Sequence, residues 1–287
     1  MTLSKPDNEV VAALVLSFNK REHTLRCLES IGRQTYPLRH VIVVDNCSAD
    51  GSADAIARRF PQVHLVRSPR NLGAAGGRNL GIRWLNQHVP YTSLLFLDGD
   101  TVADERMADE LLAVMRRYPD AGMVTPKAYR AGTSDLIASA GGMRVRLGLG
   151  SIRDMGAGQR DTGQFTEPAI VDACVGFGVL ARREALERSG GFDESYNPYG
   201  WEEVDLSLRV RQAGYTIRYA PRAVCWHAGG TPGRGRRILA YERGKMVNYL
   251  RLMARHASLG EWVSFLALSP IRAARLFSAQ LRSLLRI

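Results

Sequence analysis

The chain is poor in cysteine and has no long apolar run. Its four cysteines are widely spaced along 287 residues and form no Cys-x-x-Cys pair, which disfavours a zinc site or a redox dithiol. No stretch reaches the roughly 18 apolar residues needed to cross a bilayer. Residues 1–9 lack the apolar core of a secretory signal. We therefore expect the folded body of the chain to face the cytoplasm.

Two common nucleotide-binding motifs are also missing. No G-x-x-x-x-G-K-[ST] occurs, and the glycines of residues 71–79 do not fit G-x-G-x-x-G, so a P-loop NTPase and a dinucleotide dehydrogenase are disfavoured. This turn carries Asn71, Gly73, Arg78 and Asn79 where a helix is expected to begin, and amides at a helix N-terminus can approach a diphosphate. Glycines here also permit tight packing of a helix on a sheet, so both interpretations stay open.

Positive charge is concentrated near the C-terminus. Of the net charge of +11, +9 falls in residues 228–287, which hold eleven Lys or Arg and two acids. A nucleic-acid-binding surface would mix its basic residues with exposed aromatics, so we expect no nucleic-acid partner. Residues 238–253 and those from 271 onwards have helical spacing and predict a basic amphipathic helical tail over residues 231–287. Residues 261–287 suit an anionic membrane surface; packing on the domain or an oligomer contact is the alternative.

The first hundred residues alternate between strand and helix patterns. Apolar runs typical of buried parallel strands occupy residues 10–18, 41–44, 63–66 and 94–97. Helical spacing occupies residues 24–34, 53–60 and 75–87. This succession predicts an α/β fold with a mostly parallel central sheet flanked by helices.

The second part of the chain is less regular. Residues 130–170 are rich in Gly and polar side chains and predict hairpins and loops. They are followed by a predicted strand at 171–181, a helix at 183–188, a helix at 202–212 and a strand at 215–220. We expect one domain over residues 1–230, with the helical extension after it.

Polar side chains follow three of the predicted strands. They are Ser17 and Asn19, then Asp45, Asn46 and Ser48, then Asp98 and Asp100. Ligands of parallel sheets bind beyond the carboxyl ends of the strands, so we expect these side chains to form one site. Two carboxylates at i and i+2 can share Mg²⁺ or Mn²⁺, which completes its shell with substrate phosphates. An isolated D-x-D is more often an acidic turn, and the neighbouring Asp45 cluster favours the metal.

Four sequence blocks follow one another in a specific order. They read LSFN at 16–19 with VVDNCSADG at 43–51, NLG at 71–73 continuing to Gly81, LDGDT at 97–101, and GGFDE at 190–194 continuing through EEVDL at 202–206 to His227. In these blocks the chain resembles the family 2 glycosyltransferases with the GT-A fold, in the branch that includes bacterial rhamnosyltransferase-like enzymes. The resemblance covers roughly residues 10–230. It implies a catalytic domain over residues 1–230, with a nucleotide-sugar half at about 10–101 and an acceptor and base half at about 102–230.

The resemblance implies roles for the strand-end acids. Asp45 stands where the family contacts the base of the nucleotide, and Asp98 where it contacts the ribose or the metal. Asp100 matches the principal metal-binding carboxylate. His227 matches a late metal ligand or diphosphate contact, although a lone histidine is more often structural. The candidate nucleotide-sugar contacts are Ser17, Asn19, Asp45, Asn46, Ser48, Asn71, Gly73, Arg78, Asn79 and Asp98.

A general base is also implied by the resemblance. Glu203 stands at the family's base position, which is usually the aspartate of a Glu-Asp pair, so its side chain is longer by one methylene. Asp205 is the competing candidate, and any acid in a first helical turn can also act as a cap. The aromatic residues before the helix, Tyr196, Tyr199 and Trp201, can form an apolar face for an acceptor or simply pack.

The function expected from these features is inverting, divalent-metal-dependent transfer of a sugar from a UDP- or dTDP-sugar to an acceptor hydroxyl. The resemblance implies a glycan or lipid-linked acceptor, a role in bacterial cell-surface polysaccharide or glycolipid synthesis, and a peripheral place on the cytoplasmic face of the inner membrane. A sugar-nucleotide nucleotidyltransferase and a non-catalytic nucleotide-sugar binding protein are the alternatives.

Overall fold

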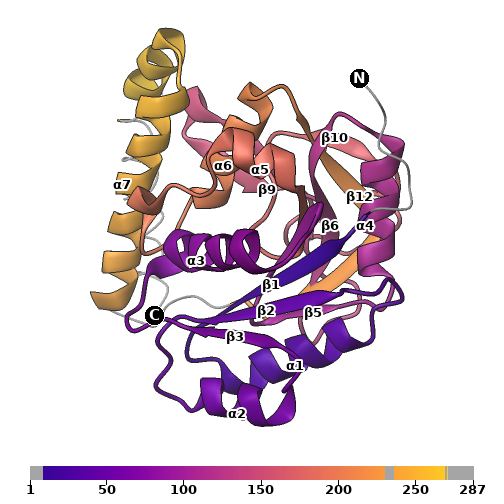
Figure 1. Cartoon of the computed structure of the whole chain (residues 1–287). Coiled ribbons are helices and arrows are strands. Elements are labelled where there is room, and N and C mark those ends of the chain that lie inside the picture. Colours follow the sequence, from indigo (N-terminus) through magenta and orange to yellow (C-terminus); the bar gives the residue numbers. More distant parts are fainter. Residues whose placement is uncertain (1–8, 230–235, 269, 271–287) are drawn as a thin grey trace, which may run out of the picture.

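The computed structural model describes residues 9–229, 236–268 and 270. The helix predicted from residue 271 onwards, with its basic stripe, therefore lies outside the described residues. Figure 1 shows the course of the chain, with a twisted central sheet between two layers of helices.

The first part of the chain forms a parallel sheet with helical crossovers, close to the predicted ranges. β1 (Val11–Ser17) lies between β2 (His40–Asp45) and β4 (Ser93–Asp98), and β3 (His64–Arg67) pairs with β2. The connecting helices are α1 (Arg21–Gly32), α2 (Ser52–Arg59) and α3 (Gly73–His88). β1 and β4 are buried along most of their length, which is why their sequences are continuous apolar runs rather than alternating ones.

The second part adds strands of both directions. β11 (Val179–Arg182) runs antiparallel between β4 and β6 (Ala121–Arg130), and β12 (Thr216–His227) runs parallel to β6. β5 (Thr101–Ala103) and β10 (Ala169–Val171) pair with β12, and β7 (Ile137–Ala140) pairs with β6. The main path of the sheet is β10-β12-β6-β11-β4-β1-β2-β3.

Two strand predictions need correction. Residues 171–181 do not form one strand, because β10 ends at Val171 and β11 begins only at Val179. Gly178 between them has a φ of +81°, a left-handed conformation that interrupts an extended backbone. The strand predicted at 215–220 continues as β12 to His227 through a register shift between Ala220 and Val224. That continuation carries His227 to the site.

Helices cover both faces of the sheet (Figure 1). α1, α2 and α4 (Met107–Arg117) pack on one face, where Leu28 and Leu111 belong to one buried cluster. α3, α5 (Arg183–Ser189) and α6 (Glu202–Gln212) pack on the other, where Leu85 and Leu206 belong to a second.

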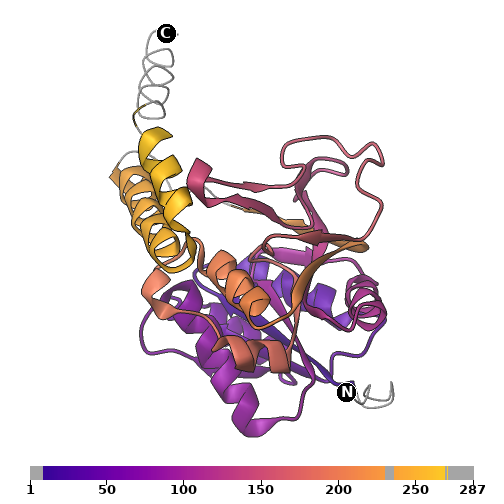
Figure 2. The same cartoon turned by 90° about the horizontal axis from the view of Figure 1, so that it is seen from above.

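The predicted tail helix packs on the domain. α7 (Arg236–His256) and a helix over residues 259–268 stand beside the hairpin of β8 (Met143–Arg146), η2 (Leu147–Leu149) and β9 (Ser151–Asp154), as Figure 2 shows. Tyr249, Leu252 and Met253 of α7 are buried in one cluster with Val204 of α6. No helix in the described part of the chain is both long and apolar enough to cross a membrane.

Candidate functional site

The three predicted strand ends meet at one edge of the sheet. In the parallel register Ser17 of β1 stands opposite Asp45 of β2, and Leu16 stands opposite Asp98 of β4. The turn after β4 passes very close to β1, and a Cβ at Gly99 would lie 3.0 Å from the carbonyl oxygen of Leu16. It would also lie 2.8 Å from Thr24 Oγ1, so a larger residue would require β1 or α1 to shift, and the Asp-Gly-Asp spacing has a steric reason.

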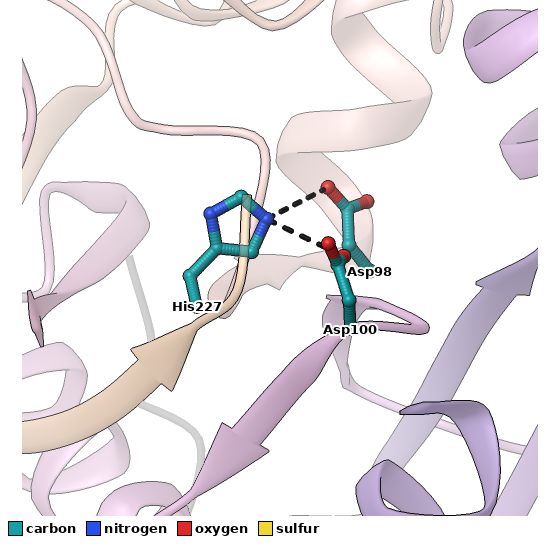
Figure 3. Close-up of side chains that lie close together, drawn as sticks. All are labelled: Asp98, Asp100 and His227. Carbon is teal, nitrogen blue, oxygen red and sulfur yellow. Dashed lines mark ion pairs between the residues drawn. The ribbon is translucent and has the colours of Figure 1, made fainter. Parts of the chain in front are cut away.

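Asp98, Asp100 and His227 form a cluster of possible metal ligands. One ligand atom from each lies within 4.8 Å of the others. His227 Nε2 is 3.4 Å from Asp100 Oδ1 and 3.9 Å from Asp98 Oδ2, and Figure 3 shows the imidazole ring facing both carboxylates. The antiparallel pairing of β5 with β12 sets His227 opposite Thr101, next to Asp100. Two carboxylates and one imidazole are a donor set that suits Mn²⁺ and also Mg²⁺.

Two further side chains support this cluster, and the sequence patterns did not predict either of them. Lys20 Nζ lies 2.6 Å from Asp100 Oδ2, and the Phe177 ring stacks on His227 with centroids 4.1 Å apart. Desolvation alone would raise the pKa of Asp100, but hydrogen bonds and charge from His227 and Lys20 hold it well below its usual range. Lys20 directly follows the first strand-end motif, so its position could have indicated this role. Phe177 gave no comparable signal.

Arg78 connects the metal-ligand cluster, which is formed by Asp98, Asp100 and His227, to α6. This helix carries the two base candidates Glu203 and Asp205 and is called the base helix below. The side chain of Arg78 is only 4% exposed, and its guanidinium donates to Asp98 Oδ1 at 2.8 Å, to the Gly176 carbonyl at 2.9 Å and to Glu202 Oε1 at 3.2 Å. Arg78 therefore contacts other residues of the protein, whereas the sequence predicted that it approaches the diphosphate. Sequence reasoning also missed Glu202, which Arg78 links to Asp98 through these hydrogen bonds.

Glu203 lies on the same side as Arg78. It lines a small cavity with Arg78, Gly176 and Phe192, and its side chain is partly exposed. Desolvation and the neighbouring charge of Glu202 raise the pKa of Glu203 to about 8, against a smaller opposing effect of Arg78. A carboxylate in this environment gains basicity, which suits a group that must take a proton near neutral pH.

Asp205, the competing base candidate, is placed elsewhere. Its carboxylate is fully buried and contacts Arg209, Arg255 and His256, with His256 Nε2 at 2.8 Å. Desolvation would raise the pKa of Asp205, but hydrogen bonds from His256 and Arg209 lower it to about 2. These contacts join α6 to α7. Asp205 is thus a structural anion that fixes the base helix, and the geometry favours Glu203 as the base.

Asp45, which the sequence predicts to contact the nucleotide base, has an unpaired buried oxygen. Asp45 is 4% exposed, and its Oδ2 accepts a hydrogen bond from the Ser48 amide at 3.2 Å. Its Oδ1 finds no hydrogen-bond partner among the described residues. Ser48 Oγ in turn accepts from the Asn19 amide, and Asn19 Oδ1 accepts from the Ala49 amide. These contacts hold the loop after β2, and Asp45 Oδ1 is left able to accept a hydrogen bond from a bound molecule.

The remaining candidate contacts form internal supports. Asn46 Nδ2 donates to Asn71 Oδ1 and to the Gly73 carbonyl, each at 3.0 Å. Asn79 hydrogen-bonds the Phe192 backbone in both directions, which ties α3 to the turn before η3 (Glu194–Tyr196). Ser17 is buried and hydrogen-bonds Thr24 of α1. These side chains shape the glycine-rich turn and hold the strand ends.

We expect Asp205→Asn to lower the free energy of unfolding by about 3 kcal/mol, because it leaves the guanidinium groups of Arg209 and Arg255 beside a neutral amide. Urea unfolding measures this. The depressed pKa of Asp205 adds stability above its unfolded pKa of about 4, and this stability is lost as pH falls towards about 2. Asp54→Asn, which removes an exposed pair with Arg67, is the control and should cost less than about 1 kcal/mol. Equal losses in both variants would contradict the structural role of Asp205.

Comparisons with known proteins show which family the chain is similar to. Residues 13–190 match the model of the family described as glycosyl transferase family 2. The chain is 28% identical over 272 residues to N-acetylglucosaminyl-diphospho-decaprenol L-rhamnosyltransferase of Mycobacterium tuberculosis, covering 88% of this chain and 87% of that protein. It is 25% identical over 221 residues to poly-beta-1,6-N-acetyl-D-glucosamine synthase of Staphylococcus epidermidis, covering 76% of this chain and 50% of the synthase.

Two solved structures share the fold. GalNAc-T7, crystallised with UDP, GalNAc and Mn²⁺, superposes with a TM-score of 0.66 at 17% identity, over 87% of this chain and 48% of that one. TarS of S. aureus superposes with a TM-score of 0.58 at 14% identity, over 89% and 41%. The chain thus spans about half the length of the synthase and of the GalNAc-T7 chain, and 41% of the TarS chain.

Proposed function

The chain belongs to glycosyl transferase family 2 and has the predicted GT-A fold, and on this premise we propose that it transfers a sugar, with inversion and with a divalent metal, from a nucleoside diphosphate to an acceptor hydroxyl. The observation that carries the proposal is the cluster of Asp98, Asp100 and His227 at the strand ends. Glu203 supports it, because Arg78 links the base helix to this cluster.

The cluster fits a divalent cation. Asp98, Asp100 and His227 would hold Mn²⁺ or Mg²⁺, and when bound the ion would neutralise charge on the departing diphosphate. Asp100 is buried and pairs with the exposed Lys20, which supports this assignment because a buried carboxylate needs a nearby cation. The GalNAc-T7 structure of the same fold contains UDP and Mn²⁺.

The chain's own residues supply the proton transfer and the orientation. Glu203 accepts the proton of the attacking hydroxyl, and its raised pKa of about 8 makes its unprotonated form a stronger base for this step. The buried side chain of Arg78 forms ion pairs with both Asp98 and Glu202. It thereby holds the metal-ligand cluster and α6 together. Inversion follows when the acceptor attacks opposite the leaving group in a single displacement, with no covalent sugar on the enzyme.

The unpaired Asp45 Oδ1 supports a uridine or thymidine donor. Both bases carry an imide N–H that can donate to this oxygen, whereas cytosine presents an acceptor at the same position. We expect Asp45→Asn to weaken UDP binding about 10- to 100-fold, the value of a hydrogen bond to a charged group, because an amide NH₂ would then face the imide N–H. Calorimetric titration with UDP and CDP in Mn²⁺ measures this. CDP affinity should not fall, and an equal loss for both nucleotides would contradict the contact.

The acceptor is proposed to be a glycan or lipid-linked sugar in bacterial cell-surface synthesis. The rhamnosyltransferase relative is named for a diphospho-decaprenol substrate. The outer surface of α7 and of residues 259–268 exposes Met246, Val247, Leu250, Val263 and Leu266 by 41–62%, which suits contact with a lipid surface from the cytoplasmic side. Flotation with anionic liposomes tests this, and a protein that stays at the bottom of the gradient contradicts it.

The activity itself is tested with a panel of nucleotide sugars in Mn²⁺. The proposal expects release of free UDP or dTDP from one donor, faster when an acceptor is present. A nucleotidyltransferase would instead consume nucleoside triphosphate and sugar phosphate. A binding protein would show stabilisation by the donor without turnover. Either of these results would contradict the proposed transfer.

A further inference from the structure

Lys245 of α7 is a cation with no carboxylate within ion-pair distance among the described residues. Its Nζ lies 4.5 Å from the centre of the Trp201 ring and 5.3 Å from that of Tyr241. Aromatic faces attract an ammonium group and hold it in place without neutralising its charge. Lys245 therefore presents a full positive charge in a defined position.

This position is fixed relative to the base helix. Trp201 directly precedes α6, and its indole Nε1 donates to the Lys245 carbonyl at 3.1 Å. Asn248, one turn further along α7, donates to the carbonyls of Tyr199 and Gly200. Both contacts clamp α7 onto the segment that immediately precedes Glu202 and Glu203. Movement of Lys245 relative to the proposed base would require breaking this set of hydrogen bonds.

Lys245 lies on the inward side of α7. Asn248, Tyr249 and Leu252 share its face of the helix and are buried, whereas Met246 and Val247 are exposed. Desolvation raises the pKa of Asp154 of β9, and a hydrogen bond from Ser139 and the charges of Lys245 and His227 oppose this rise. Asp154 therefore lies within electrostatic range of both Lys245 and His227.

We propose that Lys245 binds an anionic group of the acceptor, a phosphate or diphosphate attached to the acceptor sugar. This inference rests on the proposed transfer. An acceptor hydroxyl has to reach Glu203, so groups anchored to the segment before α6 meet the acceptor rather than the donor. The donor diphosphate is matched by the Asp98/Asp100/His227 cluster, whereas Lys245 packs against Trp201 and Tyr241. An ammonium held on the segment that precedes α6 is suited to an acceptor whose sugar carries negative charge.

The test is calorimetric titration, without donor, of two acceptor analogues. One is N-acetylglucosamine linked through a diphosphate to a short alkyl chain, and the other is the alkyl glycoside of the same sugar. We expect the wild-type protein to bind the diphosphate analogue more tightly, and Lys245→Met to weaken this binding at least about tenfold, since hydrogen bonds to charged groups are the strong ones. Alkyl glycoside binding should not change. Arg243→Met, which removes an exposed charge of the same helix, should bind like wild type.

A second variant of Lys245 and a titration with Mn²⁺ and UDP serve as controls. Lys245→Arg retains charge and ring stacking and should retain the diphosphate preference, which separates charge from folding. Equal binding of the diphosphate analogue by wild type and Lys245→Met would overturn the inference. A loss of Mn²⁺-UDP affinity in Lys245→Met would overturn it too, by placing Lys245 on the donor side. Donor hydrolysis by the wild-type protein reports separately on the proposed function, because the titrations need no turnover.

Discussion

Asp100→Asn should reduce sugar transfer by about 10³-fold or more. Asp100 contacts Lys20 and His227 and is the most buried carboxylate of the metal-ligand cluster. Its loss removes the negative charge that would hold the cation, and a Lewis-acid ion contributes several kcal/mol to such a step. The measurement is the initial rate of UDP or dTDP release with saturating donor and acceptor, across a Mn²⁺ titration.

A second readout separates metal binding from folding. Calorimetry should show that UDP binding to the wild-type protein is strengthened by Mn²⁺, and that Asp100→Asn loses this enhancement while its thermal unfolding remains cooperative. Asp54→Asn, an exposed acid on α2 paired with Arg67, should behave like wild type in both assays. Full activity of Asp100→Asn at ordinary Mn²⁺ concentration would remove the assignment of the cluster.

Glu203→Gln should lower kcat by about 10²- to 10⁴-fold, the range of a lost general base, with little change in donor affinity. Glutamine keeps the shape of the side chain in its small cavity beside Arg78 and Gly176. It cannot accept the proton. Steady-state kinetics give kcat, and titration with UDP and Mn²⁺ gives donor affinity. A matched loss of donor affinity would mean that Glu203 serves the donor site instead.

The pH profile gives an independent check of the same residue. Since the pKa of Glu203 is raised to about 8, the unprotonated base is the minor form at neutral pH, and kcat/KM should rise with pH up to about 8 and then level off. The residual activity of Glu203→Gln should lose this rise. Glu203→Asp, which installs the family's usual residue, should keep a rise and restore part of kcat. A flat wild-type profile between pH 6 and 9 would contradict the assignment.

Much of the structure of residues 10–101 could be predicted, because each strand pattern and the acids that follow it lie close together in the sequence. The runs that became β1, β2 and β4 are buried on both faces and therefore read as unbroken apolar segments. Asp45, Asp98 and Asp100 follow those runs directly, and the parallel register brings strand ends together. The grouping of these acids follows from topology alone.

The second half depends on contacts between distant segments, which periodicity does not contain. Val175 and Cys174 are buried and so resemble strand residues, yet Gly178 interrupts the extended backbone before β11. The anchoring of α7 rests on Asp205 meeting Arg255 and His256 about fifty residues later. From sequence, Asp205 was only another acid beside Glu203. The bridge of Arg78 between Asp98 and Glu202 was hidden for the same reason.

The most direct measurement is the anomalous scattering of Mn²⁺ in crystals grown with UDP. The account predicts one strong peak bound by Asp98, Asp100 and His227, in contact with the diphosphate, with the uracil imide facing Asp45. A manganese peak away from these three side chains, or UDP bound at another edge of the sheet, would contradict it.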